Sequence, residues 1–378
     1  MKAALISDGD LSQSALFARL PVIVSCEHVG MQLLSPDRFE NATLLIVDLS
    51  GASREGLENL RTQLINLRHL RLLFIVTPSD RWETVQAHSF GNIEVFDRRL
   101  GFKALAQVIQ EHHRKTLNAS MSVQVPHATR KAVLKGSGAL DEMMHACLFS
   151  ERMPVKVIRS ASSSVVEALE ADGLKNWIKA VEQHHSATYH HSLHVAGLVV
   201  AFCEQLGWQE AAREAMAAGA LIHDIGKTRI PLAILDKPGK LTECEFDLIK
   251  KHPIFGRDIL NGRPEIPPQL AAMAVHHHEY LDGSGYPDGL TEKDLNEQVR
   301  VMTICDIFAA MTEERAYKKA FPLRVALAEL EKMGGKLDQS LVLKFRSVVV
   351  DTDLGRIKKK ARPGKGPERA EQPQLKAG

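Results

Sequence analysis

The pattern of hydrophobic and polar residues changes along the chain and divides it into two main parts. Up to about residue 115, short apolar runs rich in valine, isoleucine and leucine alternate with stretches of helical spacing, such as 54–67 and 102–113. Apolar runs of this kind are typical of strands buried on both faces of a parallel sheet. The pattern predicts a doubly wound α/β domain over residues 1–115. Its five strands are expected at residues 2–7, 21–25, 43–48, 71–77 and 92–97.

Beyond residue 115 the pattern changes twice more. Residues 116–164 have no clear period and mix charged residues with glycine and serine, which indicates a connector with some local structure. From 165 to 350 the apolar residues follow helical spacing, so this part is expected to be an all-helical domain. Residues 351–378 are basic and rich in glycine and proline, which is typical of a flexible tail.

Composition narrows the class of protein. The chain of 378 residues has 48 Lys and Arg against 46 Asp and Glu, so no overall basic field favours a nucleic-acid polymer as partner. Its five cysteines contain no CxxC pair, which argues against a zinc ribbon or a disulfide framework. The N-terminus turns acidic before a signal peptide could form, and no apolar run approaches the roughly 20 residues that span a bilayer. We expect a cytoplasmic protein without a membrane partner.

The first domain is similar to the receiver domain of two-component signalling. Asp48 stands at the end of the third strand, where a receiver accepts a phosphoryl group, and Asp8 matches an acid that holds magnesium. Thr77 matches the hydroxyl residue that ends the fourth strand. However, Ser7 replaces a second acid, and Arg98 stands in the segment where a lysine is expected. The resemblance leaves two interpretations open, a phosphorylated Asp48 or a degenerate receiver used for protein contacts or a homodimer, and the departures favour the second.

Histidines and aspartates recur in the helical part. Adjacent residues of a helix point about 100° apart, so His223 and Asp224 reach one metal only near a helix end, which Gly226 would provide. By itself such a pair can equally hydrogen-bond within a core. Further candidates on other predicted helices make a metal site the better interpretation, and ligands without thiolate favour manganese, iron or zinc. These candidates are His191, His252, His277, His278 and Asp306.

The candidates fall within motifs that have a fixed order. The motifs are HHS at 190–192, HDIGK at 223–227, KKHP at 250–253, HHE at 277–279 and DGSGYP at 282–287. Followed by an aspartate, this series resembles the HD-GYP family, a branch of the HD phosphohydrolases, over residues 165–350. The resemblance implies an all-α HD-type domain that hydrolyses the second messenger cyclic di-GMP, or a related cyclic dinucleotide. Such hydrolysis would yield linear pGpG, GMP or both.

The resemblance also implies a role for individual residues. Asp224 would bridge two divalent metal ions, iron or manganese, and would share the catalytic work with Lys227, which would act on the scissile phosphate. Arg315 and Lys318 would bind the substrate phosphates. The other metal ligands would be His191, His223 and Asp306 at one ion and His252, His277 and His278 at the second ion.

The loop at 282–287 would lie over the nucleotide. Gly283, Gly285 and Pro287 would shape it, and Tyr286 would either stack on a base or pack in the core. Both roles for the tyrosine remain open at this point.

Two departures from the family pattern qualify these expectations. Ala187 stands where relatives with three metals have a glutamate, which indicates a two-metal site. Ala309 stands three residues after Asp306, where relatives often have another aspartate. Three functions therefore remain open: a cyclic di-GMP phosphodiesterase regulated by the first domain, a phosphodiesterase of another nucleotide, or an inactive sensor or scaffold that retains its metals.

Overall fold

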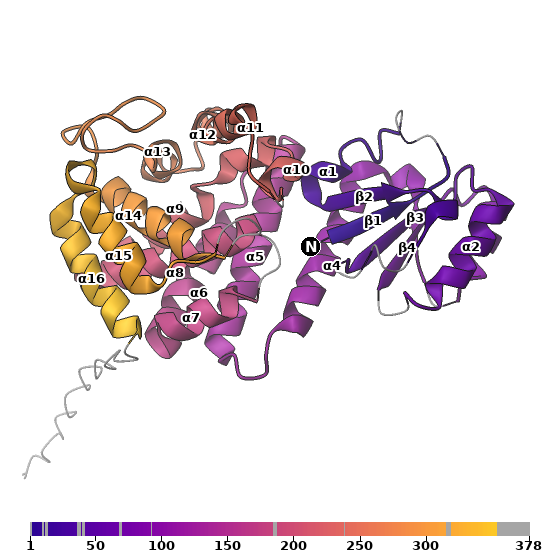
Figure 1. Ribbon diagram of the computed structural model, residues 1–378, viewed down its shortest axis with the longest axis horizontal. Helices are drawn as coiled ribbons and strands as arrows, with labels where there is room; N and C mark the ends of the chain where they lie inside the picture. Colours follow the sequence, from indigo (N-terminus) through magenta and orange to yellow (C-terminus); the bar gives the residue numbers. More distant parts are fainter. Residues whose placement is uncertain are drawn as a thin grey trace, which may run out of the picture.

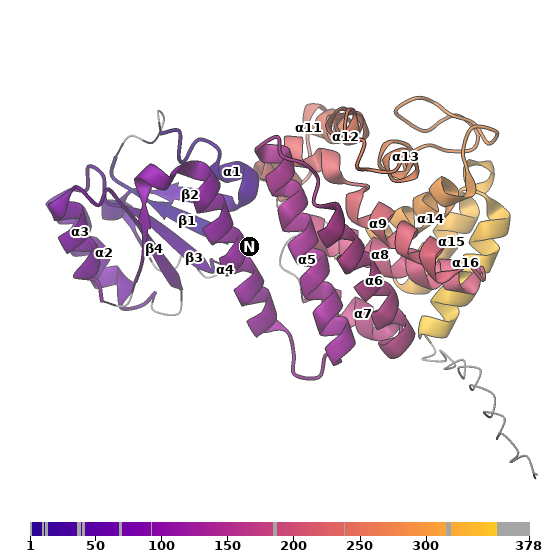
Figure 2. The same ribbon diagram turned by 180° about the vertical axis from the view of Figure 1, so that it is seen from behind.

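The computed structural model describes residues 2–353 except 10, 12–13, 36–38, 40–41, 68–69, 92, 184–186, 238 and 315–318. An α/β domain and a helical domain lie side by side in it (Figures 1 and 2). None of the described helices is both long and apolar enough to span a bilayer. Of the expected tail, residues 354–378 lie outside the described residues.

The α/β domain is built on one parallel sheet with the strand order β2-β1-β3-β4-β5. The central strand β3 pairs with its neighbour β1 so that Ala3 lies opposite Leu44, and every residue of β3 is buried. Burial on both faces explains why the strand sequence is continuously apolar. The strands are β1 Lys2–Ile6, β2 Ser25–Val29, β3 Leu44–Asp48, β4 Arg71–Val76 and β5 Glu94–Asp97.

Helices cover both faces of this sheet, as a doubly wound domain requires. On one face Leu5 and Ile46 belong to a core cluster with Leu105 of α4. On the other face Ile6 shares a cluster with Leu60 of α2. The helices are α1 Leu20–Ile23 and α4 Gly101–Ser120 on the first face, and α2 Arg54–Leu64 and α3 Arg81–His88 on the second.

The predicted position of the second strand is wrong. Residues 21–25 were expected to form it, but Leu20–Ile23 form the short helix α1, and the strand β2 begins only at Ser25. Pro21 lies in the first turn of α1, where a missing N–H costs no helical hydrogen bond. A four-residue apolar run fits either a helix or a strand, so its period carried too little information.

The helical domain has one continuous hydrophobic core that includes residues from Leu117 to Val349. Trp177 is fully buried there, and its Nε1 donates to the Leu193 carbonyl at 2.9 Å. The helices are α5 His127–Leu148, α6 Val155–Asp172, α7 Leu174–Val181, α8 Ala187–Gln205, α9 Glu210–Ile222, η4 Ile225–Arg229, α10 Leu232–Leu235, α11 Glu243–Ile249, α12 His252–Leu260, α13 Pro268–His276, α14 Glu297–Thr312, α15 Leu323–Lys332 and α16 Gln339–Asp353.

The structure corrects the expected connector at 116–164. Most of this range is helical, because it contains the end of α4, all of α5 and the start of α6. Gly136 of α5 is buried, and a Cβ there would lie 2.5 Å from Leu193 Cδ2 of α8. The small residues that suggested a linker therefore allow α5 to approach α8 closely, and they belong to the core of the helical domain.

The two domains touch along α1 and α4. The Arg19 guanidinium donates to the Leu148 carbonyl at 2.8 Å and lies 5.3 Å from the Phe102 ring centroid. Helix α1 also packs against α10, which follows the motif 223–227 in the chain (Figure 1). Contacts at α10 link the α/β domain to the segment that carries the candidate catalytic residues.

The connection between α4 and α5 is held by hydrogen bonds. Arg130 in the first turns of α5 donates to the Asn118 carbonyl at 3.1 Å, to Met121 at 3.1 Å and to Ser122 at 2.7 Å. A single guanidinium therefore fixes the end of α4 against the start of α5.

Candidate metal centre and active site

Asp224 lies between two groups of imidazoles. Its Oδ1 is 3.3 Å from His252 Nε2 and 3.9 Å from His277 Nε2. Its Oδ2 is 3.4 Å from His223 Nε2 and 3.7 Å from His191 Nε2. One buried carboxylate thus presents each oxygen to a different histidine pair, which is the arrangement that a bridging ligand needs.

The predicted ligands gather into three overlapping groups, although five separate segments supply them. Within each group, the candidate ligand atoms lie within 4.8 Å of one another. Asp306, on α14, provides an oxygen 2.8 Å from His191 Nε2. The groups are His252 with His277 and His278, His191 with His223 and Asp306, and His223 with Asp224 and His277.

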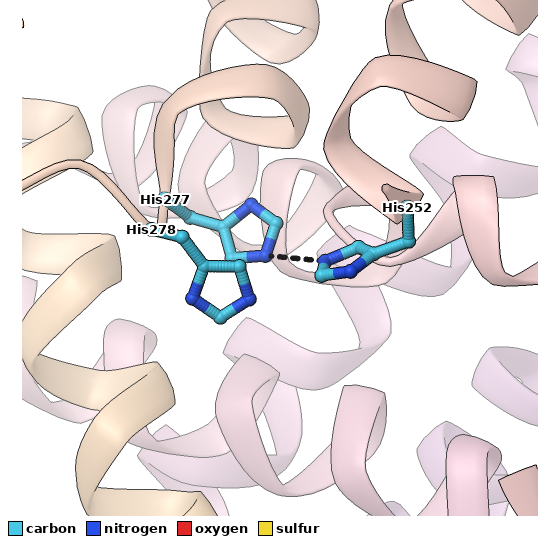
Figure 3. A group of neighbouring side chains, drawn as sticks. All are labelled: His252, His277 and His278. Atoms are coloured by element: carbon cyan, nitrogen blue, oxygen red, sulfur yellow. Dashed lines mark hydrogen bonds between the residues drawn. The ribbon is translucent and has the colours of Figure 1, made fainter. Parts of the chain in front are cut away.

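Two of the histidines turn their lone pairs toward each other. His252 Nδ1 donates to the Ile249 carbonyl at 2.8 Å, and His277 Nδ1 donates to the Met273 carbonyl at 3.0 Å. Both Nε2 atoms are therefore acceptors in the neutral rings, yet they lie 3.2 Å apart (Figure 3). His223 Nε2 is also buried, and no described residue gives it a hydrogen bond. Facing lone pairs fit a shared cation, so the residues present suit a divalent metal.

Burial and neighbouring charges prepare these groups for metal binding. Burial lowers the pKa of His252 to about 3 and the pKa of His278 to about 4, so both rings are neutral near pH 7. Burial alone would raise the pKa of Asp224, but Lys227 and His223 outweigh it and hold that pKa well below its usual range. Neutral imidazoles and an ionised carboxylate are the forms that bind divalent ions.

His191 has different surroundings. Burial alone would lower its pKa, but the neighbouring Glu313 and Asp306 carboxylates outweigh burial and raise the pKa to about 9. A metal ion at His191 would therefore bind with release of a proton.

A glycine brings the central motif onto its neighbour. Helix α9 ends at Ile222, and the chain continues as the 3-10 turn η4 from Ile225. A Cβ on Gly226 would lie 1.8 Å from the His252 carbonyl oxygen, so only glycine lets η4 lie against α12. The same turn places Lys227 Nζ 2.5 Å from Asp224 Oδ2. The expected helix end near His223 and Asp224 is present, but it lies at Ile222, and Gly226 is part of η4.

The loop at 282–287 packs directly on the ligands. The Tyr286 ring stacks on the His278 ring, with centroids 4.8 Å apart and an angle of 26° between the planes. Lys250 Nζ lies 5.2 Å from the Tyr286 centroid. A Cβ on Gly285 would lie 2.4 Å from Glu279 Cα, so this glycine permits close approach of the loop to the HHE segment. Tyr286 thus supports a predicted ligand in this structure.

Two acids of the site were missed by the sequence reasoning or given only a vague role. Glu279 is buried and accepts hydrogen bonds from the backbone N–H groups of residues 288–290, at 2.6 to 3.1 Å. Glu313 is buried and lies 3.0 Å from His191 Nδ1. The sequence spacing could have indicated Glu313 as a site residue, because it follows Asp306 by seven residues, or two helical turns, and so lies on the same side of the helix. Arg315 and Lys318 lie outside the described residues.

Comparison with known proteins agrees with this geometry. A protein-family model described as "HD domain" matches residues 175–341, which include all the predicted metal ligands. The chain is 40% identical over 181 residues to the cyclic di-GMP phosphodiesterase response regulator RpfG of Xanthomonas campestris pv. campestris, over 47% of each protein. The helical domain belongs to the HD-GYP family.

Other relatives of the HD-GYP domain differ in the substrate that their names give. The chain is 40% identical over 154 residues to 3′3′-cGAMP-specific phosphodiesterase 3 of Vibrio cholerae serotype O1, over 41% of this chain and 33% of that protein. The chain therefore spans about half the length of RpfG and a third of the Vibrio protein. The solved structure of Bd1817, an HDG"Y"P protein from Bdellovibrio bacteriovorus, shares the fold with a TM-score of 0.51 and 18% identity, over 65% of this chain and 80% of that one.

Outside the HD-GYP domain, the candidate phosphoacceptor already has a cationic partner. Arg98 donates to Asp48 Oδ1 at 2.5 Å and to Oδ2 at 3.1 Å, and it also donates to Thr77 Oγ1 at 3.3 Å. Asp8 accepts from the Met31 N–H at 2.7 Å and from Ser53 Oγ at 2.8 Å. The acids that would hold magnesium and phosphate in a receiver are thus engaged by groups of the domain itself.

Proposed function

We propose that the chain is a metal-dependent phosphodiesterase that hydrolyses cyclic di-GMP to linear pGpG, GMP or both. The observation that carries this proposal is the position of Asp224, whose two oxygens face two separate histidine pairs. Two metal ions act together on a phosphodiester when the protein holds them close to each other, and a carboxylate shared between two ligand clusters can do this. The relative RpfG, named as a cyclic di-GMP phosphodiesterase, supports the choice of substrate.

The proposed cofactor is a pair of divalent ions, iron or manganese, since the ligands are imidazoles and carboxylates without thiolate. When bound, the ions stabilise the charged phosphoryl oxygens and lower the pKa of water enough to supply a nucleophile at neutral pH. Asp224 would be shared between the two positions. The remaining ligands would be His191, His223 and Asp306 at one position and His252, His277 and His278 at the other.

The chain's own residues supply the rest of the chemistry. Lys227 carries a cation next to Asp224 and is only partly buried, so its ammonium can turn to the phosphoryl group and neutralise the charge that develops there. Gly285 lets the loop pack closely against the HHE segment, and the Tyr286 ring stacks on the His278 ring and so helps to orient this ligand. Phosphate binding by Arg315 and Lys318 stays a prediction.

Regulation by the α/β domain is part of the proposal. Its support is the contact between α1 and α10, which follows Lys227 by five residues. We further propose that this domain contacts other proteins or a second copy of the chain. A cytoplasmic location would give the enzyme access to its nucleotide substrate.

A second candidate substrate is a cyclic GMP-AMP dinucleotide, because the Vibrio protein named as specific for 3′3′-cGAMP is as identical to this chain as RpfG is. The two substrates differ in one purine and present the same phosphodiester chemistry to the metal centre. A third function, binding without turnover, would leave the metals and the nucleotide bound together.

The test is turnover by the full chain, purified without oxygen, analysed for metal and supplied with iron or manganese. Cyclic di-GMP and 3′3′-cGAMP are assayed in parallel, with Asp224→Ala as the inactive control. We expect linear product from cyclic di-GMP with the wild type only. Product from 3′3′-cGAMP alone would change the substrate, and nucleotide binding without product at full metal occupancy would assign a sensor.

A further inference from the structure

We propose that Glu313 is a positioning residue for the metal ligand His191, and that it strengthens binding at one of the two metal positions. That position is the one formed by His191, His223 and Asp306. The inference rests on the two-metal site proposed above. It goes further because it gives the two positions unequal affinities and names the residue responsible.

The contacts of His191 define its orientation. Both oxygens of Glu313 lie close to His191 Nδ1, at 3.0 and 3.1 Å, and the opposite ring atom Nε2 lies 2.8 Å from Asp306 Oδ1. A carboxylate at Nδ1 accepts the proton of that nitrogen, so the Nε2 lone pair is left for a metal beside Asp306. Glu313 thereby selects both the tautomer and the direction of the ligand atom.

Three of the other histidines of the site, His223, His252 and His277, are oriented by neutral groups, whereas His278 Nδ1 lies 3.7 Å from Asp306 Oδ2. The Nδ1 atoms of these three histidines donate to backbone carbonyls one turn earlier in the chain. A carbonyl orients a ring as well as a carboxylate does, but a carboxylate also adds negative charge and makes the imidazole a stronger donor to the metal. These neutral contacts are His223 to Ala220 at 2.7 Å, His252 to Ile249 at 2.8 Å and His277 to Met273 at 3.0 Å.

Glu313 is itself firmly placed. Its side chain is 3% exposed, and its backbone N–H donates to the Ala309 carbonyl at the end of α14. His194 Nδ1 lies 3.3 Å from Glu313 Oε1, and His190 Nδ1 lies 3.7 Å from the same oxygen. The carboxylate is therefore fixed by its own helix and by several imidazoles of α8, so its position relative to His191 is well determined.

A purely structural role for Glu313 makes a different prediction. If the carboxylate only balanced the charge of the buried histidines, its loss would lower thermal stability and leave metal affinity unchanged. Metal affinity is thus the readout that separates the two roles, and it can be measured without any nucleotide.

The experiment titrates the metal-free full chain with Mn²⁺ and measures binding by calorimetry and by competition with a chelator. In Glu313→Gln we expect binding at one of the two positions to weaken by about 10- to 100-fold, while the second position keeps its affinity. Glu314→Gln is the matched control, because it makes the same change one residue later at an exposed acid. It should bind both ions like the wild type.

A second variant covers the case in which Glu313→Gln folds poorly. Glu313→Asp keeps the charge and shortens the side chain by one methylene, so it should recover part of the lost affinity. Wild-type affinity at both positions of Glu313→Gln, or equal weakening at both, would overturn the inference. A wild type that binds two ions and turns over no nucleotide would contradict the proposed function and leave this inference standing.

Discussion

Lys227 is the residue whose geometry most directly suggests a catalytic role. Its ammonium lies 2.5 Å from a carboxylate that the metals would share, and it stays accessible from one side. Bound metal ions would compete for that carboxylate and free the lysine for the substrate.

We therefore expect Lys227→Met to lower kcat by about 100-fold or more, since removal of one stabilising cation from a transition state has effects of this size. The metal content should stay at the wild-type value. Lys237→Met is the control. Lys237 is not one of the site residues, and its Nζ forms an ion pair with Glu245 Oε2 at 2.6 Å. Equal kcat in the Lys227→Met and wild-type proteins would rule out the role of Lys227.

Asp141 is a second residue with a measurable consequence. It is 3% exposed and accepts from Tyr189 Oη at 3.0 Å, while its Oδ2 receives no hydrogen bond from the residues that the structure describes. Burial raises its pKa from 3.8 to about 7. A carboxyl group with a raised pKa in the folded state stabilises the fold at low pH, and this stabilisation is lost as the pH rises through about 7.

The expected result is that wild-type thermal stability falls between pH 5 and pH 8 more steeply than that of Asp141→Asn. The shift in pKa corresponds to an effect on the order of 2–4 kcal/mol. Unfolding midpoints at both pH values measure it, with Glu142→Gln as the control at the neighbouring exposed acid. Parallel pH profiles for the wild type and Asp141→Asn would contradict the prediction.

At this scale the sequence predicted what short motifs encode. Each predicted metal ligand lies in one of the motifs or, like Asp306, follows them in the chain, so the seven candidates could be named together. Glu313 and Asp141 lie outside these motifs, and their partners His191 and Tyr189 are 122 and 48 residues away in sequence. Such contacts depend on how helices pack, which residue spacing alone does not specify.

At the scale of elements, helix α5 shows where sequence patterns mislead. Glycine and serine indicate loops when they interrupt a pattern, but they also allow two helices to come close. Gly136, Ser137 and Gly138 are all buried in α5. The pattern lost its period there because small residues replaced the large apolar ones that make a helical period visible.

Two glycines of α5 make this interpretation testable. A Cβ at Gly136 would lie 2.5 Å from Leu193 Cδ2, whereas a Cβ at Gly138 would meet nothing closer than Arg114 Cδ at 3.9 Å. Gly138→Ala should gain up to about 1 kcal/mol of stability from helix propensity. Gly136→Ala should lose more than that gain to overpacking, which typically costs about 1–3 kcal/mol.

Unfolding midpoints of the two variants and the wild type provide the measurement. We expect the highest unfolding midpoint for Gly138→Ala, the next for the wild type and the lowest for Gly136→Ala. Equal stability of the two variants would mean that α5 and α8 are not in close contact at Gly136.

At the scale of the whole molecule, the α/β domain has the strand order β2-β1-β3-β4-β5, and among its described residues the acids Asp8 and Asp48 are both engaged by other groups of the domain. Arg98 binds both oxygens of Asp48, and the Ser50 N–H donates to Oδ1 at 3.0 Å. A small phosphodonor would have to displace this guanidinium before it could reach the carboxylate. Signals would then reach the HD-GYP domain through contacts such as α1 on α10 rather than through phosphorylation.

Acetyl phosphate with Mg²⁺ should therefore leave the mass of the full chain unchanged and should not alter its phosphodiesterase rate. Intact-mass spectrometry and turnover measure the two effects. A receiver that has the usual lysine serves as the positive control. A phosphoryl adduct that disappears in Asp48→Ala would show that the ion pair opens and that the domain is a working receiver.

The guanidinium of Arg130 has a consequence for how such proteins are recombined. It joins the last turn of α4 to the first turns of α5 by hydrogen bonds, so the connection between the two helices is held in place and does not act as a free linker. A chimera that exchanges the input half must be spliced within residues 121–126 and must keep α5, because the core of the helical domain includes residues of that helix. A graft of different length would turn the new half away from α10 and so remove the contact through which we propose that the α/β domain regulates the helical domain.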